Sequence, residues 1–525
     1  MSVHNADSLD FNVHEWWYCP SRRSAMRAKT SENSLSRAHT SSRPWYLMLL
    51  LVPRAASAYQ LPSRGAAAPC RSASASCVLA PENPSAASEY PPMAPFEPAK
   101  RLAGSGKPTV WGEFGQLAAS TGAVNLGQGF PDWQPPEFVV EEAQTALRTG
   151  YHQYTRPAGH PQLVEVLAQR YSKHLERPID ATTEVAITVG ASQALYLTLQ
   201  ALLDPGDEVL LMEPAFDLYY GQVRIAGGTV VPVPLEVDES GRQWTLNADR
   251  LAAAVTPKTK VLVVNSPHNP TGKVFSADEM AQIADVVRRH PKLLVISDEV
   301  YKYTVYGDNA NHQHFAALPG MYERTVTLSS AGKTFSVTGW QAGWCIGPAH
   351  LLKPIQLMLP FVQFCVSTPM QQALSRVLVK ADEPYLGHPS YYAWLCEMFR
   401  SKREILATGL RRCGMVPMEG QGGFFLMADT SALEVPEKYL RETTPAAPDG
   451  VTRDWALCRW MALEGGVIAI PSSPFFSADN KELAGRYVRF AFCKGDGTLK
   501  EASDRLACLS SCDVEALKKA PVMGS

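Results

Sequence analysis

Residues 329–344 read SSAGKTFSVTGWQAGW, and a single lysine, Lys333, stands near the start of this stretch among small residues. The apolar run TVTL at 325–328 precedes it and predicts a buried strand. Burying a lysine costs free energy unless the amine pairs with an opposite charge or forms a covalent bond. Desolvation lowers the pKa of an amine and frees it to form an imine with an aldehyde cofactor. A surface lysine is the commoner explanation of such a residue, so this interpretation needs partners elsewhere in the chain.

The first partner is Asp298, which follows the apolar segment LLVI at 293–296. Such a run predicts a fully buried parallel strand, and ligands of open α/β sheets bind beyond the carboxyl ends of strands. A carboxylate there can keep a pyridine nitrogen protonated, which makes the ring an electron sink. The alternative is an aspartate that caps the start of a helix.

Two further segments end in polar groups. The segment VLVVNSPHNPTGKVF at 261–275 predicts a strand followed by an Asn-Pro turn, where Asn269 can donate to a phenolic oxygen or simply serve the turn. The segment AITVGASQALYL at 186–197 predicts a strand that breaks at Gly190 and enters a helix near Ser192. Backbone N–H groups at such a helix start can bind phosphate.

Together these segments resemble the fold-type I, pyridoxal-phosphate-dependent aminotransferases of class I/II, from about residue 111 to about residue 508. Within that class the chain is most similar to the kynurenine–oxoglutarate transaminases, also called glutamine transaminase K or cysteine-S-conjugate β-lyase. The interval from Asp298 to Lys333 matches the usual separation in the family. The motifs that carry the resemblance are VWGEF at 110–114, NLGQGFPDW at 125–133, QYTRPAGHPQL at 153–163, EPAFDLYY at 213–220, SPHNPTGKVF at 266–275, SDEVYKYTVY at 297–306, SAGKTFSVTGW at 330–340 and YVRFAF at 487–492.

This resemblance implies pyridoxal 5'-phosphate as cofactor and three catalytic residues. Lys333 would form the imine and then carry the proton, Asp298 would pair with the ring nitrogen, and Tyr301 would bond the phenolic oxygen together with Asn269. No metal site is implied. The other implied cofactor contacts are Tyr154, from the neighbouring subunit of a homodimer, and Ala191, Ser192, Phe216 and Ser330.

The resemblance also implies a substrate site for an L-amino acid and a 2-oxo acid, the amino acid being of the kynurenine, glutamine, methionine or aromatic type. Arg489 would bind the α-carboxylate in a bidentate fork. Gly129, Trp111 and Asn269 would border the same pocket. The alternatives are a cysteine-S-conjugate β-lyase as the main activity, and a non-catalytic sensor that binds the cofactor.

The chain departs from the family pattern at two places. Gln341 stands where relatives place a basic residue near the phosphate, and a neutral hydrogen bond there is about half as strong as a charge-assisted one. The segment FVQFCVSTP at 361–369 offers Cys365 and Val366 where close relatives carry an aromatic residue and a histidine. This difference puts a preference for kynurenine in doubt and allows smaller or thioether side chains such as methionine.

The alternation of apolar strands and helices predicts an α/β fold with a mainly parallel sheet flanked by helices. The resemblance implies that this sheet has seven strands and that a smaller α/β domain follows at the C-terminal end. The expected boundaries are an N-terminal arm at 97–131 that joins the small domain, a large cofactor-binding domain at 132–379, a small domain at 380–515 and a tail at 516–525. A capping box at Ser276–Glu279 predicts a helix start. The segment 442–453, ETTPAAPDGVTR, predicts a loop.

Composition gives no reason to expect a nucleic-acid partner or a stable membrane association. The 525 residues carry a formal net charge of −2 and 46% hydrophobic residues. The eleven cysteines are scattered, which argues against a disulfide framework, and His312 and His314 are expected in a polar loop.

The first 96 residues predict a targeting presequence. WYLMLLLV at 45–52 suits a signal-peptide core, and Ala56-Ser-Ala58 suits a cleavage site. The following Arg/Ser/Ala-rich and acid-poor segment is typical of a transit peptide. The tandem resembles the bipartite presequences of algae with secondary plastids, so a plastid is expected, with mitochondrion and cytoplasm as alternatives.

Overall fold

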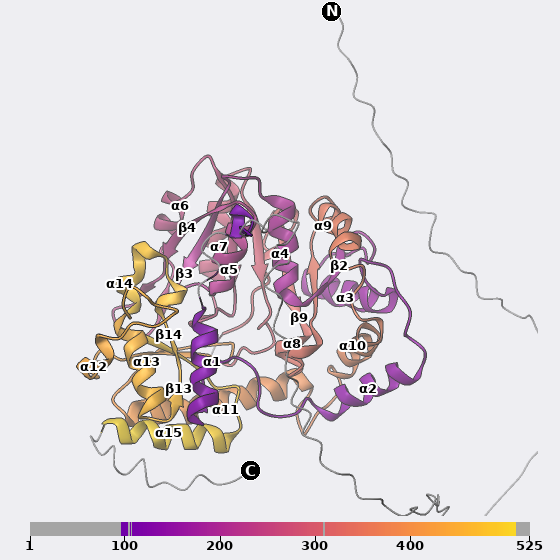
Figure 1. Cartoon of the computed structure of the whole chain (residues 1–525). Helices are drawn as coiled ribbons and strands as arrows, with labels where there is room; N and C mark the ends of the chain where they lie inside the picture. Colours follow the sequence, from indigo (N-terminus) through magenta and orange to yellow (C-terminus); the bar gives the residue numbers. More distant parts are fainter. Residues whose placement is uncertain (1–95, 103–105, 107, 308–309, 511–525) are drawn as a thin grey trace, which may run out of the picture. The chain divides into compact units, whose positions relative to one another are not determined.

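The computed structural model describes residues 96–102, 106, 108–307 and 310–510 (Figure 1). The expected presequence at 1–96 lies outside these residues except for Phe96, and the expected tail at 516–525 lies outside them entirely. No helix in the described part of the chain is long and apolar enough to cross a membrane.

A seven-stranded sheet forms the centre of the larger part. Strand β10 (Ala342–Ile346) is antiparallel to both strands beside it, and all other neighbouring strands of the sheet pair in parallel. This arrangement confirms the predicted mainly parallel sheet. Across the sheet the strands are β2 (Val185–Val189), β10 (Ala342–Ile346), β9 (Thr325–Ser330), β8 (Leu294–Asp298), β7 (Thr259–Asn265), β3 (Glu208–Glu213) and β4 (Thr229–Pro234).

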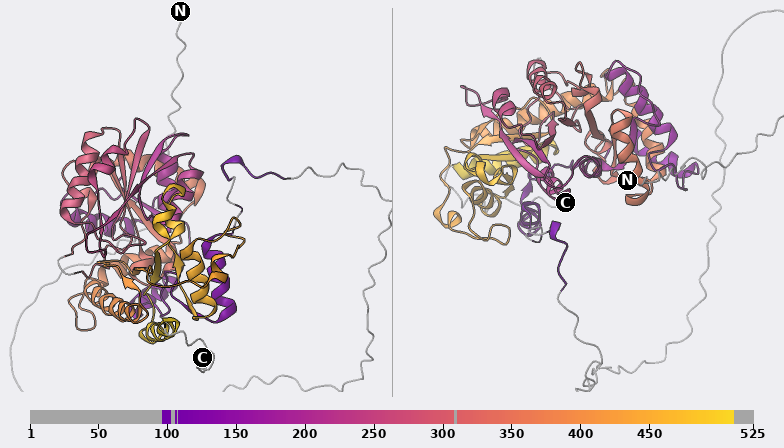
Figure 2. Two further views of the ribbon diagram at one scale, coloured as in Figure 1. Left: turned by 90° about the vertical axis from the view of Figure 1, so that its left-hand side faces the viewer. Right: turned by 90° about the horizontal axis from the view of Figure 1, so that it is seen from above.

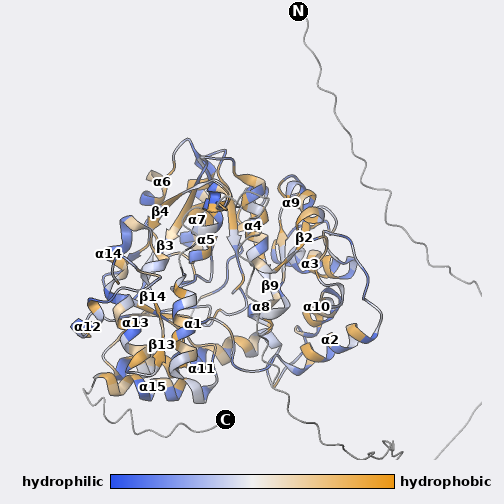
Figure 3. Cartoon of the chain, viewed as in Figure 1, coloured by the Kyte–Doolittle hydropathy of each residue, from blue (hydrophilic) through white to orange (hydrophobic). Residues whose placement is uncertain are grey.

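Helices cover both faces of this sheet, because alternate side chains of each strand point to opposite sides. On β3, Val209 and Leu211 belong to one apolar core, with α4 (Gly190–Leu202), α5 (Asp217–Ile225) and α9 (Ala349–Val362). Leu210 and Met212 belong to the other core, with α3 (Pro161–His174) and α7 (Ala277–Arg289). Orange along β3 and β4 in Figure 3 marks this apolar interior. Ser276 and Glu279 form the predicted capping box of α7.

A smaller sheet organises the C-terminal part in the order β11 (Val416–Pro417), β12 (Phe425–Asp429), β15 (Tyr487–Ala491) and β14 (Ile470–Pro471). Helices α11 (Tyr391–Arg412), α13 (Arg453–Leu463) and α15 (Asp496–Ser510) belong to this part. The predicted loop at 442–453 lies between α12 (Glu437–Leu440) and α13, apart from its last residue, Arg453, which begins α13. The fold therefore has the expected smaller C-terminal domain.

Residues 110–125 of the N-terminal arm pack against this C-terminal part, as Figure 1 shows for α1 (Val110–Thr121), and Figure 2 gives two further views. Helix α1 contacts α13, and β1 (Val124–Asn125) pairs in parallel with β13 (Val467–Ile468). The expected boundaries at 97–131, 132–379 and 380–515 stay predictions. The remaining α-helices and β-strands of the described chain are α2 (Glu137–Arg148), β5 (Glu236–Val237), β6 (Trp244–Thr245), α6 (Ala248–Ala253), α8 (Ala331–Thr334), α10 (Thr368–Lys380) and α14 (Lys481–Ala484).

Candidate active site

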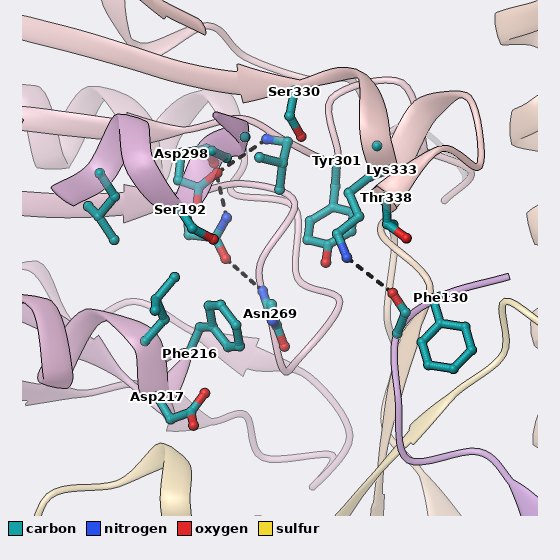
Figure 4. A pocket seen from close by; sticks show the side chains of 18 of the residues that line it. Phe130, Ser192, Phe216, Asp217, Asn269, Asp298, Tyr301, Ser330, Lys333 and Thr338 are labelled. Atoms are coloured by element: carbon teal, nitrogen blue, oxygen red, sulfur yellow. Dashed lines mark hydrogen bonds between the residues drawn. The ribbon is translucent and has the colours of Figure 1, made fainter. Parts of the chain in front are cut away.

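A cavity of about 680 Å³ opens beyond the carboxyl ends of β7, β8 and β9 (Figure 4). Each of these strands ends in a polar residue, respectively Asn265, Asp298 and Ser330, and Asn265 pairs in register with Asp298. All three residues line the cavity. The parallel sheet thus brings together side chains that are far apart in the sequence, as expected for this kind of topology.

Lys333 lies on the short helix α8, directly after β9, and its side chain is half-buried in the cavity. Its Nζ donates a 3.1 Å hydrogen bond to the carbonyl of Gly129 and lies 5.5 Å from the centre of the Phe424 ring. Burial is the main cause that lowers the pKa of Lys333, and the nearby Arg489 cation adds to it. A lowered pKa increases the fraction of neutral amine, the form that attacks a carbonyl carbon.

Asp298 faces the same cavity from the end of β8. Its Oδ2 accepts a 2.7 Å hydrogen bond from the hydroxyl of Tyr219, and its Oδ1 accepts a 3.3 Å bond from the amide of Val300. Burial raises the pKa of Asp298 to about 6, although these hydrogen bonds and Lys333 oppose the shift. A cation held against this carboxylate would favour its charged form, so the site suits a protonated ring nitrogen.

Asn269 and Tyr301 form the next part of the cavity wall. The backbone amide of Asn269 donates to Asn265 Oδ1 at 2.7 Å, and Asn265 Nδ2 donates to the carbonyl of Asp298 at 3.0 Å. The ring of Tyr301 is buried edge-on against Phe424, with centroids 5.1 Å apart, and burial raises the pKa of its hydroxyl. Asn265 therefore fixes the turn that presents Asn269 beside Tyr301.

Arg489 reaches the cavity from β15 and is only 1% exposed. Its Nη1 donates to Asn269 Oδ1 at 3.0 Å and its Nη2 to the carbonyl of Gly127 at 2.8 Å, whereas its buried Nε has no partner among the described residues. Burial lowers the pKa of Arg489 to about 10. The rings of Phe425 and Phe475 lie 4.1 Å and 5.0 Å from its Cζ. A buried guanidinium with an unpaired donor suits a carboxylate ligand.

The start of α4 lies at another edge of the cavity. Gly190, with φ of 70°, begins the helix, and Ala191 and Ser192 line the cavity. Within the described chain, the N-cap residue Val189 has no side chain that caps their amides, and Gln193 Oε1 accepts only from the Val189 amide, at 2.6 Å. Gln341 lies beside this turn, since a Cβ on Gly190 would come within 2.6 Å of its Oε1. Gln341 Nε2 donates to the carbonyl of Thr338. Lys333 and Arg489 are the basic residues of the cavity lining within the described chain, so this edge relies on backbone N–H groups and hydroxyls.

Three expected residues form the remaining wall. Phe216 lines the cavity and packs edge-on against Tyr219 at 5.9 Å. Trp111 also lines it, and its ring lies 5.0 Å from Arg489 Cζ. Gly129 must lack a side chain, because a Cβ there would lie 2.5 Å from the Phe425 ring.

Two expected contributors lie away from this cavity. Tyr154 is 71% exposed and packs against Phe364, with ring centroids 4.6 Å apart. Cys365 is partly buried, and neither it nor Tyr154 is among the residues that line the cavity. Their expected contacts are with a neighbouring subunit, so these expectations stay predictions.

The donor set fits pyridoxal 5'-phosphate. The cavity offers an amine of lowered pKa, a carboxylate opposite it, and an uncapped helix start for the phosphate. The unpartnered Nε of Arg489 adds a place for a carboxylate of an amino acid. The residues that suit the cofactor lie at the large sheet, and the arginine that suits the substrate carboxylate lies on the smaller sheet.

Comparison with known proteins agrees with this arrangement. Residues 121–506 match the family model of the class I and II aminotransferases. Kynurenine–oxoglutarate transaminase of Dictyostelium discoideum is 42% identical over 78% of this chain and 96% of its own length. Human kynurenine–oxoglutarate transaminase 3 is 40% identical over 78% of this chain and 89% of its own length. The crystal structure of Bna3p from Saccharomyces cerevisiae superposes with a TM-score of 0.74 at 30% identity, covering 80% of this chain and all of that chain.

The chain therefore belongs to the class I and II aminotransferases, whose cofactor is pyridoxal 5'-phosphate. Within that class it is a kynurenine–oxoglutarate transaminase-like aminotransferase. The expected cofactor, enzyme class and family are thereby confirmed.

Sequence reasoning missed several residues of the site. Three residues that line the cavity were assigned no role from the sequence: Tyr219, Asn265 and Asp217. Two of them, Tyr219 and Asp217, belong to the quoted motif EPAFDLYY. His312 and His314 lie in a loop, as expected. Their side chains are only 9% and 12% exposed, because both bond Oε2 of the buried Glu299, at 3.1 Å and 2.6 Å.

Proposed function

We propose that the protein exchanges the amino group between an L-amino acid of the kynurenine, glutamine, methionine or aromatic type and a 2-oxo acid. The observation that carries this proposal is the convergence of Lys333, Asp298 and Arg489 on one cavity of about 680 Å³. The identity to kynurenine–oxoglutarate transaminases supports it. The structure of Escherichia coli YbdL, described with a methionine aminotransferase function, superposes with a TM-score of 0.70 at 30% identity, covering 79% of this chain and all of that chain.

Three residues of the cavity would take part directly in the reaction. Bound pyridoxal phosphate supplies an electron sink for negative charge at the substrate Cα. Asp298 holds a proton on the ring nitrogen, and Lys333 removes and returns the Cα proton with its Nζ. Arg489 binds and orients the substrate carboxylate, because it is the buried guanidinium of the cavity lining and its Nε has no partner among the described residues.

The other cavity residues would hold the cofactor in place. Phe216 would pack on one face of the ring, and Asn269 with Tyr301 would bond its phenolic oxygen. Backbone amides at the start of α4 and the hydroxyl at the end of β9 would bind the phosphate. Those phosphate contacts would be Ala191, Ser192 and Ser330.

A homodimer is part of the proposal, because Tyr154 would complete the phosphate site of the partner subunit. In support, two large apolar side chains at and just beyond the C-terminal end of α9 are exposed. Phe361 is 90% exposed, and Phe364, which packs on Tyr154, is 44% exposed. Burying such side chains against a second copy would lower the free energy of the assembly.

We further propose import into a plastid, on the sequence of 1–96 alone. Fluorescent-protein fusions of residues 1–96 and of the chain starting at 97 would test it. Plastid fluorescence with the first fusion is expected, and fluorescence in the mitochondrion or cytoplasm would contradict it.

The test of the activity is a panel of amino acids offered to the purified holoenzyme with a 2-oxo acid. Formation of the new amino acid and the new 2-oxo acid in equal amounts is the expected result. Release of ammonia and pyruvate from a cysteine S-conjugate would instead identify β-elimination as the main activity. Spectral changes with amino acids but no turnover of any pair would contradict the proposal and favour a sensor.

A further inference from the structure

Glu213 ends β3 and is completely buried, but none of the expected site roles uses it. We propose that Glu213 is a positioning residue that fastens the segment 472–480 to the large sheet and thereby holds Phe475 against Arg489. The kinetic part of this inference rests on the proposed function, whereas its structural part does not.

The carboxylate of Glu213 accepts hydrogen bonds from residues of the large-sheet part and of the C-terminal part. Its Oε1 accepts from the hydroxyl of Tyr220 at 2.5 Å and from the backbone amide of Ser477 at 2.6 Å. Its Oε2 accepts from Asn480 Nδ2 at 2.6 Å and from the Ser477 hydroxyl at 3.3 Å. Among these partners, Ser477 and Asn480 belong to the C-terminal part, whereas Tyr220 lies on α5.

The fastened segment carries one wall of the substrate site. The carbonyl of Phe475 accepts hydrogen bonds from Ala215 N, at 2.7 Å, and from the Tyr220 hydroxyl, at 3.2 Å. The Phe475 ring lies 5.0 Å from Arg489 Cζ and 6.4 Å from the Trp111 ring. A shift of the segment would therefore change the surroundings of the guanidinium that binds the substrate carboxylate.

The same short stretch, 213–217, also faces the cofactor site. Phe216, which lies between Glu213 and Asp217 in the sequence, lines the cavity. Asp217 accepts a 2.6 Å hydrogen bond from Trp111 Nε1. Residues 213–217 thus join the large sheet to the segment 472–480 on one side and to the N-terminal arm on the other. Both connections bring an aromatic ring next to Arg489.

Glu213→Gln tests this role with little change of shape. A carboxylate can accept all four hydrogen bonds, whereas a glutamine amide has one acceptor oxygen and a nitrogen that only donates. The amide nitrogen would replace one of the two oxygens, so either the Ser477 amide on Oε1 or Asn480 Nδ2 on Oε2 would lose its acceptor, which is costly in the interior. Asn480→Ala removes one donor from the other side and serves as a second variant if Glu213→Gln does not fold.

Glu208→Gln is the matched control. Glu208 begins the same strand that Glu213 ends, and its Oε2 also accepts two hydroxyl hydrogen bonds, from Thr256 at 2.5 Å and Thr259 at 3.2 Å. It does not line the cavity. Both variants replace a glutamate by a glutamine, but the effect of Glu208→Gln should be confined to the other end of β3.

Hydrogen–deuterium exchange of the protein without cofactor tests the structural part. The amides of Ser477 and Asn480 bond Glu213 and the Ser477 carbonyl, respectively. Glu213→Gln should accelerate exchange in a peptide covering 475–480 by about tenfold, the factor for 1.4 kcal/mol lost locally, while Glu208→Gln leaves it unchanged. Unchanged exchange in both Glu213→Gln and Asn480→Ala would overturn the proposal.

Kinetics of the holoenzyme test the functional part. Glu213→Gln should raise KM by about tenfold for glutamine, methionine and phenylalanine alike, because the site for the shared carboxylate is loosened. The cofactor dissociation constant should match that of the parent enzyme. Faster exchange at 475–480 without any rise in KM would overturn the link to Arg489. If the parent enzyme transaminates no amino acid, the proposed function fails, but the exchange result still decides whether Glu213 fastens the segment.

Discussion

The indole Nε1 of Trp111 donates a 2.6 Å hydrogen bond to Oδ2 of Asp217, although the two residues are 106 positions apart. This bond attaches the N-terminal arm to the first turn of α5 and places a carboxylate in the cavity wall. Burial raises the pKa of Asp217, while Trp111 and Arg489 oppose that shift. Besides Asp298 and Lys333, the cavity wall thus contains an acidic residue, Asp217, and a basic one, Arg489, and the charge of Asp217 affects which substrate side chains the site accepts.

Asp217→Asn should weaken discrimination against acidic amino acids. A carboxylate in the wall repels a substrate side-chain carboxylate, so the parent enzyme is expected to prefer glutamine to glutamate. Removal of the charge should reduce that preference by about tenfold, or about 1.4 kcal/mol. The measurement is kcat/KM for both amino acids, with the exposed Asp249→Asn on α6 as the control. An unchanged ratio would show that Asp217 does not face the substrate side chain.

Lys333→Ala should abolish turnover but leave noncovalent binding of pyridoxal phosphate. The half-buried Lys333 is the amine of lowered pKa that faces the cavity, whereas the phosphate contacts come from other elements. Borohydride treatment of the parent holoenzyme should fix the cofactor on the peptide that contains Lys333, and the variant should not be labelled there. Substantial transamination by the variant without an added amine would contradict the assignment.

Asp298→Asn should stabilise the protein without cofactor at pH 7.5. Burial raises the pKa of Asp298 from 3.8 to about 6, so between these values the folded protein binds a proton that the unfolded chain does not. This group's contribution to the free energy of unfolding is therefore present at low pH and lost as the pH rises through 6. Asparagine avoids the buried charge, with an expected gain of about 1–2 kcal/mol.

Thermal unfolding of the parent and Asp298→Asn proteins without cofactor, at pH 4.5 and 7.5, checks this expectation. The difference in Tm should shrink at the lower pH. The same variant should lose activity by far more than tenfold when loaded with cofactor, because a neutral amide cannot hold the ring nitrogen protonated. A variant that is less stable than the parent at pH 7.5 would show that the carboxylate is not strained in the absence of cofactor.

Tyr154→Ala and Lys333→Ala should complement each other in mixed dimers. In a dimer with shared sites, the Tyr154→Ala chain provides an intact Lys333 and the Lys333→Ala chain provides an intact Tyr154, so one site is complete. Activity after mixing and reassociation should exceed that of either variant alone. Each variant mixed with itself is the control. Absence of recovery despite proven exchange of subunits would contradict the proposed role of the exposed Tyr154.

The sequence predicted the parts of the site that lie in or directly after apolar strands. Asp298 and Lys333 were found because a buried strand leaves its last polar residue at the carboxyl end of the sheet. Tyr219 could not be assigned, since its hydroxyl reaches Asp298 across 79 residues from a helix that looks like ordinary core. The burial of His312 could not be predicted, because it accompanies a contact with Glu299. The sequence around His312 does not reveal this contact.

Gln341→Arg should tighten cofactor binding without changing the order of preferred substrates. Gln341 lies beside the first turn of α4, where the phosphate is expected, and no Lys or Arg of the described chain other than Lys333 and Arg489 lines the cavity. A guanidinium there adds a charge-assisted hydrogen bond to a dianion, worth about 1.5–3 kcal/mol when shielded from water, or at least about tenfold in the dissociation constant. The backbone at 341 is already left-handed, with φ of 48°, so the exchange of one side chain for another adds no new strain.

Dialysis and reconstitution of the parent and Gln341→Arg proteins give the two dissociation constants. Gln356→Arg is a suitable control, because Gln356 bonds the carbonyls of Thr182 and Val185 away from the cavity lining. Tighter binding by both variants would indicate a general effect of added positive charge, which high salt should remove. Tighter binding by Gln341→Arg alone would mean that the phosphate site lacks a cation. No gain in either would mean that Gln341 already supplies an equivalent contact or that its side chain faces away from the phosphate, and the argument from missing charge would then be wrong.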